Sequence, residues 1–221
     1  MTNKIHIKDM ILSSGKTIQS ITLSNGQLTI VVHTYGARLH QLFVPDKNGT
    51  FENILLSKDN SNSYENDEGY YGVICGPVAG RIAGAAFDNV VLEKNEGENC
   101  LHSGSKGWER QIWSYKTFSN EDTVGITLML KDTYSEFPGQ IETSVSYVLA
   151  YSTLKVKMTG LAYEDTIFNP AFHPYFNLSA ERTNTLTHEI STNAECLVEA
   201  DKENIPTGRL LKVDDTIYNL K

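Results

Sequence analysis

The stretch TVGITLMLK, residues 123–131, alternates apolar side chains with small or polar ones. Val124, Ile126, Leu128 and Leu130 fall on one side of an extended chain, and the residues between them fall on the other. Successive side chains of a β-strand point to opposite faces of the sheet, so a half-buried strand has this period of two. The segment therefore predicts a strand with one face in a hydrophobic core.

The same alternation recurs in QLTIVVH (27–33) and in LKVKMTG (154–160). Turn-forming pairs separate such segments, at Asn25-Gly26, Asn48-Gly49 and Pro138-Gly139. No stretch keeps a helical apolar period for three turns, and no shift in composition marks a second domain. We therefore expect an all-β protein, an antiparallel β-sandwich or a related fold, with residues 1–221 forming a single domain. The polar stretch KDNSNSYENDEG (58–69) predicts an exposed loop.

The composition narrows the class of partner. The 221 residues carry a formal net charge of −8, and the sequence pI is about 5.2. Nucleic acids and anionic membrane surfaces attract basic faces, so we expect neither as a partner and favour a neutral small molecule. The N-terminal residues show no secretion signal, and no run of about 18 apolar residues predicts a membrane helix. The three cysteines, Cys75, Cys100 and Cys196, fit free thiols in a reducing cytoplasm.

The six histidines show none of the short spacings typical of metal ligands, so we expect no metal site. Motifs for binding nucleotide phosphates or dinucleotides are also missing from the sequence. Three other segments contain residues suited to chemistry.

The first segment is GPVAGRIAGAAF (76–87), in which small residues surround Arg81. Small residues let the backbone approach a ligand closely, and a guanidinium offers a fork of donors to oxygen atoms. The alternative is a tightly packed strand turn with Arg81 in a structural ion pair, which the residues alone favour.

The second segment, NEGENCLHSGSKGWERQIW (95–113), places His102 in a loop rich in Gly and Ser, ahead of Trp108 and Trp113. Aromatic faces stack on pyranose rings, so this histidine and the tryptophans could form part of a sugar site. An exposed loop histidine beside two core tryptophans is an equally good interpretation.

The third segment is NPAFHPYFNL (169–178). A period of two puts Phe168, Phe172 and Phe176 on one face, and His173 and Tyr175 on the other. The prolines exclude a helix and indicate an edge or bulged strand, which can aim a side chain at a site. The alternative is a core histidine satisfied by a polar neighbour, which is the favoured interpretation for this segment by itself.

Together these segments resemble the aldose 1-epimerase (galactose mutarotase) family. GPVAGRIAGAAF is similar to the family's GRxANRI segment and has Arg81 at the position of its arginine. CLHSGSKGWERQIW resembles the family's LHGG…GF…W segment and has His102 at the position of its first histidine. NPAFHPYFNL resembles NxTNHxYFNL and places the second histidine on His173. EFPGQIETSVSYVL (136–149) and IPTGRLLKVDDTIYNLK (205–221) match two further segments in order. The sequence departs from these patterns at Pro77, Gly80, Ser103 and Phe172.

The resemblance implies a large antiparallel β-sandwich that interconverts the α and β anomers of free aldoses such as galactose and glucose, without a cofactor. It implies that His173 is the general acid and that His102 and Arg81 bind the sugar and its developing oxyanion. Both histidines are thus catalytic candidates. We expect Tyr175, on the same face as His173, to line the pocket. A monomer and a homodimer remain open.

The family's general-base glutamate and a sugar-binding aspartate would lie beyond Lys221, so the resemblance predicts a sandwich that is incomplete at its C-terminal end. Glu98 and Glu109 lie near the His102 loop, but we interpret both as solvated loop acids. Three alternatives to a working epimerase remain: a non-catalytic sugar-binding sandwich or inactive fragment, a chain completed by a partner, and a hexose-6-phosphate 1-epimerase.

Overall fold

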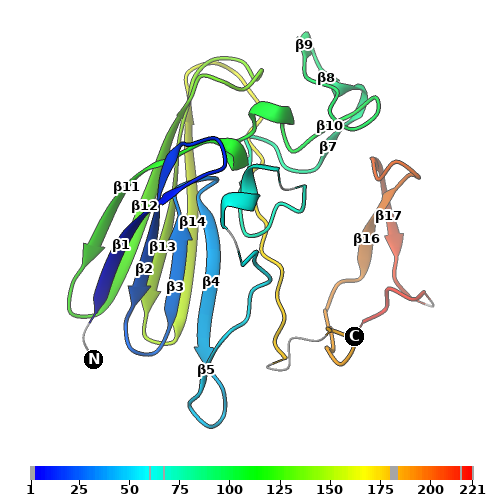
Figure 1. The fold of residues 1–221 in the computed structure, drawn as a ribbon. Helices are drawn as coiled ribbons and strands as arrows, with labels where there is room; N and C mark the ends of the chain where they lie inside the picture. Colours follow the sequence, from blue (N-terminus) through cyan, green and yellow to red (C-terminus); the bar gives the residue numbers. More distant parts are fainter. Residues whose placement is uncertain (1–2, 60, 67, 180–183, 215, 221) are drawn as a thin grey trace.

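Two antiparallel sheets form the main body of the chain (Figure 1), in a computed structural model that describes residues 3–59, 61–66, 68–179, 184–214 and 216–220. The first sheet contains, in spatial order, β1 (Lys4–Ile11), β2 (Thr17–Ser24), β3 (Thr29–His33), β4 (Arg38–Pro45) and β5 (Phe51–Asn53). The second contains β11 (Ser114–Ser119), β12 (Thr123–Asp132), β13 (Ile141–Ala150) and β14 (Thr153–Ala162). Within each sheet every strand pairs antiparallel with its neighbour in sequence.

The predicted alternation holds strand by strand. On β12, Val124, Ile126 and Leu128 are fully buried, while Lys131 on the opposite face is exposed. The predicted strands over 27–33 and 154–160 appear as β3 and as part of β14. One hydrophobic cluster takes side chains from β2, β3 and β4 on one side and from β12 and β13 on the other. The two sheets therefore pack face to face, and the predicted all-β antiparallel sandwich is confirmed.

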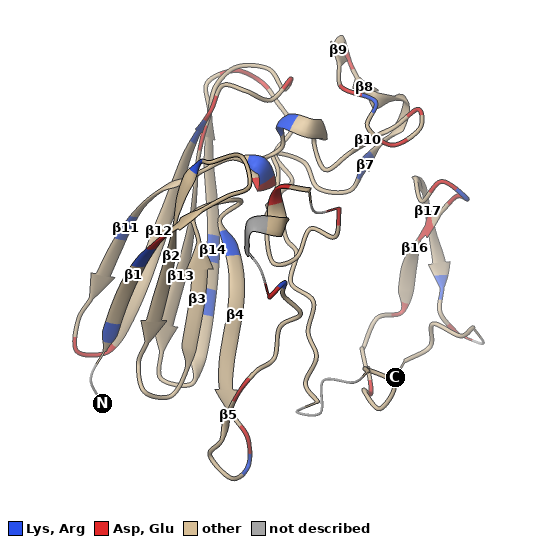
Figure 2. Ribbon diagram, in the orientation of Figure 1, with Lys and Arg blue, Asp and Glu red and all other residues tan. Residues whose placement is uncertain are grey.

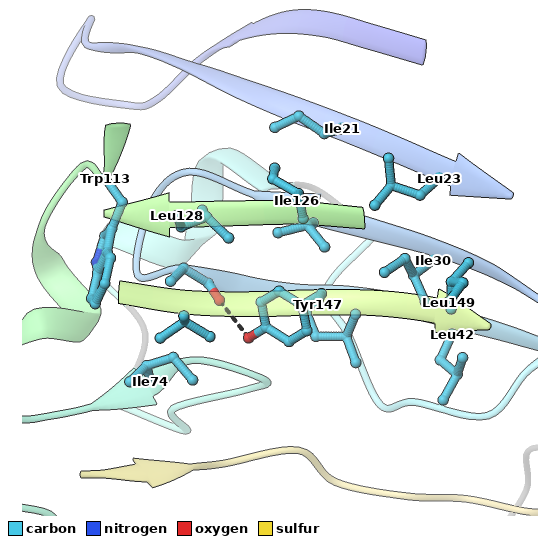
Figure 3. Packing of buried hydrophobic residues seen from close by; sticks show 14 of the residues in the cluster. Ile21, Leu23, Ile30, Leu42, Ile74, Trp113, Ile126, Leu128, Tyr147 and Leu149 are labelled. Carbon is cyan, nitrogen blue, oxygen red and sulfur yellow. Dashed lines mark hydrogen bonds between the residues drawn. The ribbon is translucent and has the colours of Figure 1, made fainter. Parts of the chain in front are cut away.

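Tyr147 on β13 links the two sheets through a hydrogen bond. Its side chain is fully buried, and its phenol donates a 2.7 Å bond to the Ala37 carbonyl, which lies just before β4 (Figure 3). A buried carbonyl without a partner is costly, so this bond satisfies a group that the core would otherwise leave unpaired.

In the sequence between β5 and β11, the chain forms short strands and 3₁₀ turns. The strands are β6 (Ile74–Cys75), β7 (Arg81–Ile82), β8 (Ala86–Phe87), β9 (Val90–Val91) and β10 (Cys100–Leu101), with β15 (Ala171–Phe172) following the second sheet. The turns are η1 (Ser61–Asn66), η2 (Ala83–Ala85), η3 (Gly104–Lys106) and η4 (Trp108–Arg110). β6 pairs with β15, β7 with β10, and β8 with β9. The β6–β15 and β7–β10 pairs bring segments distant in sequence side by side, whereas β8 and β9 form a local hairpin.

A final hairpin, β16 (Cys196–Ala200) and β17 (Pro206–Lys212), stands apart from the two sheets in Figure 1. Its tip reaches the loop before β10, where the Asn99 side-chain amide donates a 3.2 Å hydrogen bond to Glu203. The hairpin is therefore linked to the part of the chain that carries His102.

The prediction of an exposed loop over 58–69 is wrong at its centre. Tyr64 in η1 is only 3% exposed, and its hydroxyl lies 2.9 Å from His40 Nδ1 and accepts a hydrogen bond from the Lys58 amide. Residues 60 and 67 lie outside the described part. The polar composition of this segment predicted exposure, but the single aromatic ring of Tyr64 packs inward and anchors the segment against β4.

The cysteines are free thiols, as predicted, with Cys75 and Cys100 buried and Cys196 exposed. Among the described residues, no helix has the length and hydropathy that a membrane span requires.

Candidate functional site

His102 follows β10 in a turn that is fixed to the strand segment beside it. Its amide donates a 3.0 Å bond to the Gly80 carbonyl, and the Gly80 amide donates a 3.0 Å bond to His102 Nδ1. Next to it, the Ser103 hydroxyl accepts from the Val78 amide and donates to the Val78 carbonyl. Because Nδ1 accepts a hydrogen bond, the neutral imidazole carries its proton on Nε2. That N–H is the group His102 can offer to a ligand.

His173 is held by its backbone at the end of the β6–β15 pair. Its amide donates to the Val73 carbonyl at 3.0 Å, and its carbonyl accepts from Gly72 at 2.9 Å. The regular strand is limited to Ala171–Phe172, although isolated bridges and hydrogen bonds continue the pairing on both sides. The predicted irregular strand is thus confirmed, and Phe172 packs against the main core as its face predicted.

The two histidines meet in space. Their ring centroids are 5.6 Å apart with the rings perpendicular, and both imidazoles are half-buried. The Tyr175 ring lies 5.1 Å from His173, which agrees with the expectation that they share a face. Tyr70 completes the group, with its ring 4.5 Å from His102 and 6.0 Å from His173. We call these four residues the histidine site.

The backbone at the histidine site is strained. His102, Ser103 and Tyr70 adopt φ values of +50°, +70° and +53°, in the left-handed region that side-chain-bearing residues seldom occupy. Each such conformation costs about 1–3 kcal/mol and persists only where the surroundings impose it, often at a functional site. Five other described non-glycine residues also have a positive φ, so the strain accompanies the ring contacts and does not by itself mark a site.

Arg81 on β7 belongs to the surroundings of His102 but is engaged in an ion pair. Its Nε and Nη2 both donate to the Glu96 carboxylate, the second at 2.7 Å. The structural ion pair considered from sequence is therefore present. Arg81 nevertheless lies close enough to act electrostatically on the His102 imidazole.

Burial, with smaller contributions from the nearby His173 and Arg81 charges, lowers the pKa of His102 to about 4, while Glu96 opposes the shift. An imidazole with so low a pKa is neutral at pH 7. His102 is consequently suited to donating a hydrogen bond from Nε2, and much less suited to giving up a proton as an acid.

The tryptophans do not take part. Trp108 and Trp113 are each 1% exposed, and their indole N–H groups bond to Asp132 and to the Trp108 carbonyl. The interpretation as core tryptophans is confirmed, and stacking of a sugar on either ring is excluded. The aromatic ring beside the histidines is Tyr70, which the sequence analysis missed. The Gly69-Tyr70-Tyr71-Gly72 stretch, two tyrosines between glycines after a polar segment, was the available signal.

Glu109 corrects another expectation. We interpreted Glu98 and Glu109 as solvated loop acids; Glu98 is exposed and paired with Lys94, whereas Glu109 is only 5% exposed. Neither Glu109 carboxylate oxygen has a hydrogen-bond partner on another described residue, and Arg110 Nε lies 3.7 Å away. Burial raises the pKa of Glu109 to about 8, so this carboxyl is largely protonated at neutral pH.

A second pair of histidines lies at β3 and β4. His33 and His40 stack with ring centroids 4.3 Å apart, and the Arg38 guanidinium lies 3.7 Å from the centre of the Tyr64 ring beside them. His33 is 1% exposed. Burial is the main cause that lowers the pKa of both, with His40 at about 4.

Metal chemistry finds no support in the part of the chain that the structure describes, where no three His, Cys, Asp or Glu side chains gather as metal ligands. The arrangement offers instead an acid–base group, a fixed imidazole N–H and an arginine. These suit a neutral, hydroxyl-bearing ligand.

Known proteins share both the sequence and the fold. An aldose 1-epimerase from Streptococcus thermophilus is 36% identical over 225 residues, covering 95% of this chain and 62% of the relative. A galactose mutarotase from Bos taurus is 30% identical over 218 residues, covering 96% and 63%. A crystal structure of galactose 1-epimerase from Lactobacillus acidophilus matches the fold with a TM-score of 0.85 at 24% identity, covering 99% of this chain and 66% of that one. The chain thus spans just under two thirds of the length of these relatives.

The family profile described as aldose 1-epimerase matches residues 19–221. This match includes Arg81, His102, His173 and Tyr175, together with both sheets except β1 and the first two residues of β2. The chain belongs to the aldose 1-epimerase family.

Proposed function

We propose that this chain binds a free aldose, such as galactose or glucose, at the histidine site and promotes the interconversion of its anomers. The observation that carries the proposal is the approach of His102 and His173, which directly follow strands of two different pairs, to a ring distance of 5.6 Å. Relatives named aldose 1-epimerase and galactose mutarotase support it. The chain spans 62–63% of the length of these two relatives.

The reaction needs an acid and a base. A base removes the proton of the C1 hydroxyl, an acid protonates the ring oxygen, and the bond between C1 and that oxygen breaks to give the open-chain aldehyde. Rotation about the C1–C2 bond followed by reclosure gives the other anomer. The sugar is neither oxidised nor reduced, so the residues need only to bind it and move protons.

His173 is the proposed acid. His102 is poorly suited to the acid role because, with a pKa near 4, its imidazole is neutral at pH 7 and has no extra proton to give. Its Nδ1 also already accepts a hydrogen bond. His102 Nε2 instead donates to the sugar, and the Arg81 Nη1, which takes no part in the ion pair with Glu96, donates to the developing oxyanion. Tyr70 and Tyr175 line the site.

The site does not offer a well-placed base to accept the proton of the C1 hydroxyl. Glu96 is the carboxylate that acts on the His102 imidazole, and Arg81 holds it by two hydrogen bonds. Both oxygens of this carboxylate already accept a hydrogen bond from Arg81, so it is poorly placed to receive the C1 proton. We therefore expect turnover below that of a complete acid–base pair. The same observation favours a second candidate function, sugar binding without catalysis.

A hexose-6-phosphate substrate is disfavoured. Glu96 neutralises Arg81, and Arg110, a second basic side chain at the histidine site, already interacts with Tyr70 and donates to the Glu65 carbonyl. A phosphate would meet a site with little positive charge to hold it.

Polarimetry tests the proposal. Freshly dissolved α-D-galactose should lose optical rotation faster with the chain than in buffer alone, and His173→Asn should reduce the acceleration by about 10²–10⁴-fold. His6→Asn is the matched control, because His6 is exposed on β1. Galactose binding without acceleration would support the second candidate. An undiminished rate in His173→Asn would refute the role of His173.

A further inference from the structure

An open cavity of about 440 Å³ brings three basic side chains together at the surface of the chain. Lys16 comes from the turn between β1 and β2, Arg110 from η4, and Lys131 from β12. Among the described residues that line this cavity there is no Asp or Glu, and no member of the histidine site. Its volume falls in the range of roughly 300–1,000 Å³ that is usual for small-molecule sites.

This grouping of positive charge runs against the composition of the chain. The formal net charge is −8, and Figure 2 shows acidic residues on many of the loops, among them the β11–β12 turn and the tip of the β16–β17 hairpin. Cations that lie close together repel one another, and an anion that binds among them removes that cost. The acidic remainder of the surface repels large polyanions. The charge distribution therefore favours a small anion.

The acids near these cations are neutral or face another cavity. Arg110 Nε lies 3.7 Å from Glu109, but burial raises the pKa of Glu109 to about 8, so this carboxyl is largely neutral at pH 7. Glu142 is the cross-strand neighbour of Lys131 and lines the adjoining cavity with it, but does not line this one. Neither Lys16 nor Lys131 forms an ion pair with a described residue. Most of the positive charge is thus available to a ligand.

Glu65 holds two walls of the cavity in place. Its carboxylate accepts hydrogen bonds from the Ser14 amide and hydroxyl, at 2.7 and 2.6 Å, in the turn that carries Lys16. Its backbone carbonyl accepts a 3.3 Å bond from Arg110 Nη1. The third wall, with Lys131, is an inner strand of a four-stranded sheet. A ligand would meet backbone that is already positioned, which lowers the entropy cost of binding.

The rest of the lining offers apolar surface. Ile112 is 40% exposed and Tyr134 is 55% exposed. The half-buried Met129 precedes Lys131 by two residues and so lies on the same face of β12. Covering exposed apolar side chains is favourable, by about 25 cal/mol for each Å² removed from water. A bare inorganic anion leaves this surface exposed, whereas an anion with an organic group covers it.

We propose that this cavity binds a small phosphate ester, with the phosphate among Lys16, Arg110 and Lys131 and the organic group against Ile112 and Tyr134. Arg110 is held by Glu65 and contributes fixed charge, while the flexible stems of the two lysines bring their ammonium groups to the phosphate oxygens. The cavity contains no residue of the histidine site, so the proposal is independent of the function proposed above.

Calorimetric titration at pH 7 with phenyl phosphate, inorganic phosphate and phenol tests the proposal. Phenyl phosphate should bind one per chain, about tenfold more tightly than inorganic phosphate, and phenol should not bind. Lys131→Met should weaken phenyl phosphate binding about tenfold, because it removes one contact to a charged group. Lys131 is exposed, so this variant should fold.

Lys116→Met is the matched control. Lys116 is exposed on the same face of the same sheet, where it pairs with Thr127, but it does not line the cavity. This variant loses the same charge and should keep the affinity of the parent chain. Lys16→Met, in the β1–β2 turn, should instead weaken binding by a factor similar to that of Lys131→Met.

A folded chain that does not bind phenyl phosphate would overturn the site. Equal affinities in Lys131→Met, Lys16→Met and Lys116→Met would do the same, because the binding would then lie elsewhere. Phenyl phosphate that binds no more tightly than inorganic phosphate would overturn the assignment of an ester. All of these results are obtained without a sugar, so they are distinct from failure of anomer exchange at the histidine site.

Discussion

The chain contains two pairs of adjacent histidines that are built differently. At the histidine site, His102 and His173 lie perpendicular at 5.6 Å, are half-buried, and come from two different strand pairs. In the second pair, His33 and His40 stack at 4.3 Å on neighbouring strands, packed against Tyr64. Both imidazoles of the first pair are half-buried, whereas in the second pair His33 is enclosed by protein and only His40 is half-buried.

The difference shows that closeness of histidines is not by itself a functional signal. Burial lowers the pKa of His33, His40 and His102 alike, so electrostatics do not separate the pairs either. What distinguishes the histidine site is the left-handed backbone of His102 itself and the Arg81 charge that acts on its imidazole. We therefore expect substitutions in the first pair to change activity and those in the second to change stability.

The largest expected effect is on turnover. His173→Asn should lower the polarimetric rate by about 10²–10⁴-fold while the melting temperature changes little, because His173 is half-buried. His33→Asn should do the reverse, since it disturbs a fully enclosed ring. Measuring rate and melting temperature on both variants checks this, and loss of activity in His33→Asn with a folded chain would break the comparison.

The next effect is a loss of stability in acid. Folded His40 has a pKa of about 4, below its unfolded value of 6.5, and the pKa of His33 is lowered too. As the pH falls through this window the unfolded chain binds protons that the folded chain does not, so the free energy of unfolding decreases. Each histidine contributes a slope of about 1.4 kcal/mol per pH unit.

Urea unfolding between pH 4 and 7 measures this slope. His40→Gln should reduce it by the contribution of about one proton, which is about 1.4 kcal/mol per pH unit. His6→Gln, at the exposed position on β1, serves as the control. His102 acts with the same sign, so part of the slope should remain. A slope unchanged by His40→Gln would show that this pair is not what limits stability in acid.

The buried Glu109 carboxyl should make the folded chain less stable as the pH rises. Its folded pKa of about 8 lies above the unfolded 4.5, so the folded chain keeps a proton that the unfolded chain loses, and stability falls as the pH rises from 4.5 to 8. Glu109→Gln should therefore be more stable than the parent chain at pH 8, on the order of 1–3 kcal/mol, and should lose that advantage near pH 4.5.

Thermal unfolding at the two pH values checks this, with Glu98→Gln as the exposed control. A Glu109→Gln variant that is less stable than the parent at pH 8 would show that the carboxylate is charged and paired in the folded chain.

The smallest effect concerns the link between the sheets. Tyr147→Phe removes the donor to the Ala37 carbonyl and leaves that carbonyl buried, so it should cost about 1–3 kcal/mol of unfolding free energy. Tyr115→Phe on β11, whose side chain is partly buried, provides a matched control and should cost less. Equal losses in the two variants would argue against the bond across the sandwich.

The sequence predicted the sandwich because half-buried strands carry a local period of two, as in β12 and β14. It could not show that His102 and His173 meet, because that depends on the pairing of β7 with β10 and of β6 with β15, which no local pattern encodes. The family resemblance supplied that expectation.

Burial of single polar residues was also beyond local reasoning. Glu109 and Tyr64 both lie in polar stretches, yet tertiary packing encloses them. Composition describes the average residue of a segment, and a single inward side chain does not alter that average.

NMR of the histidine rings, titrated with D-galactose, tests the central claim most directly. The account predicts that the imidazole signals of His102 and His173 shift with saturation while those of His33 and His40 stay unchanged. Shifts confined to His33 and His40, or no shift in any ring at saturating galactose, would contradict the assignment of the sugar site to His102 and His173.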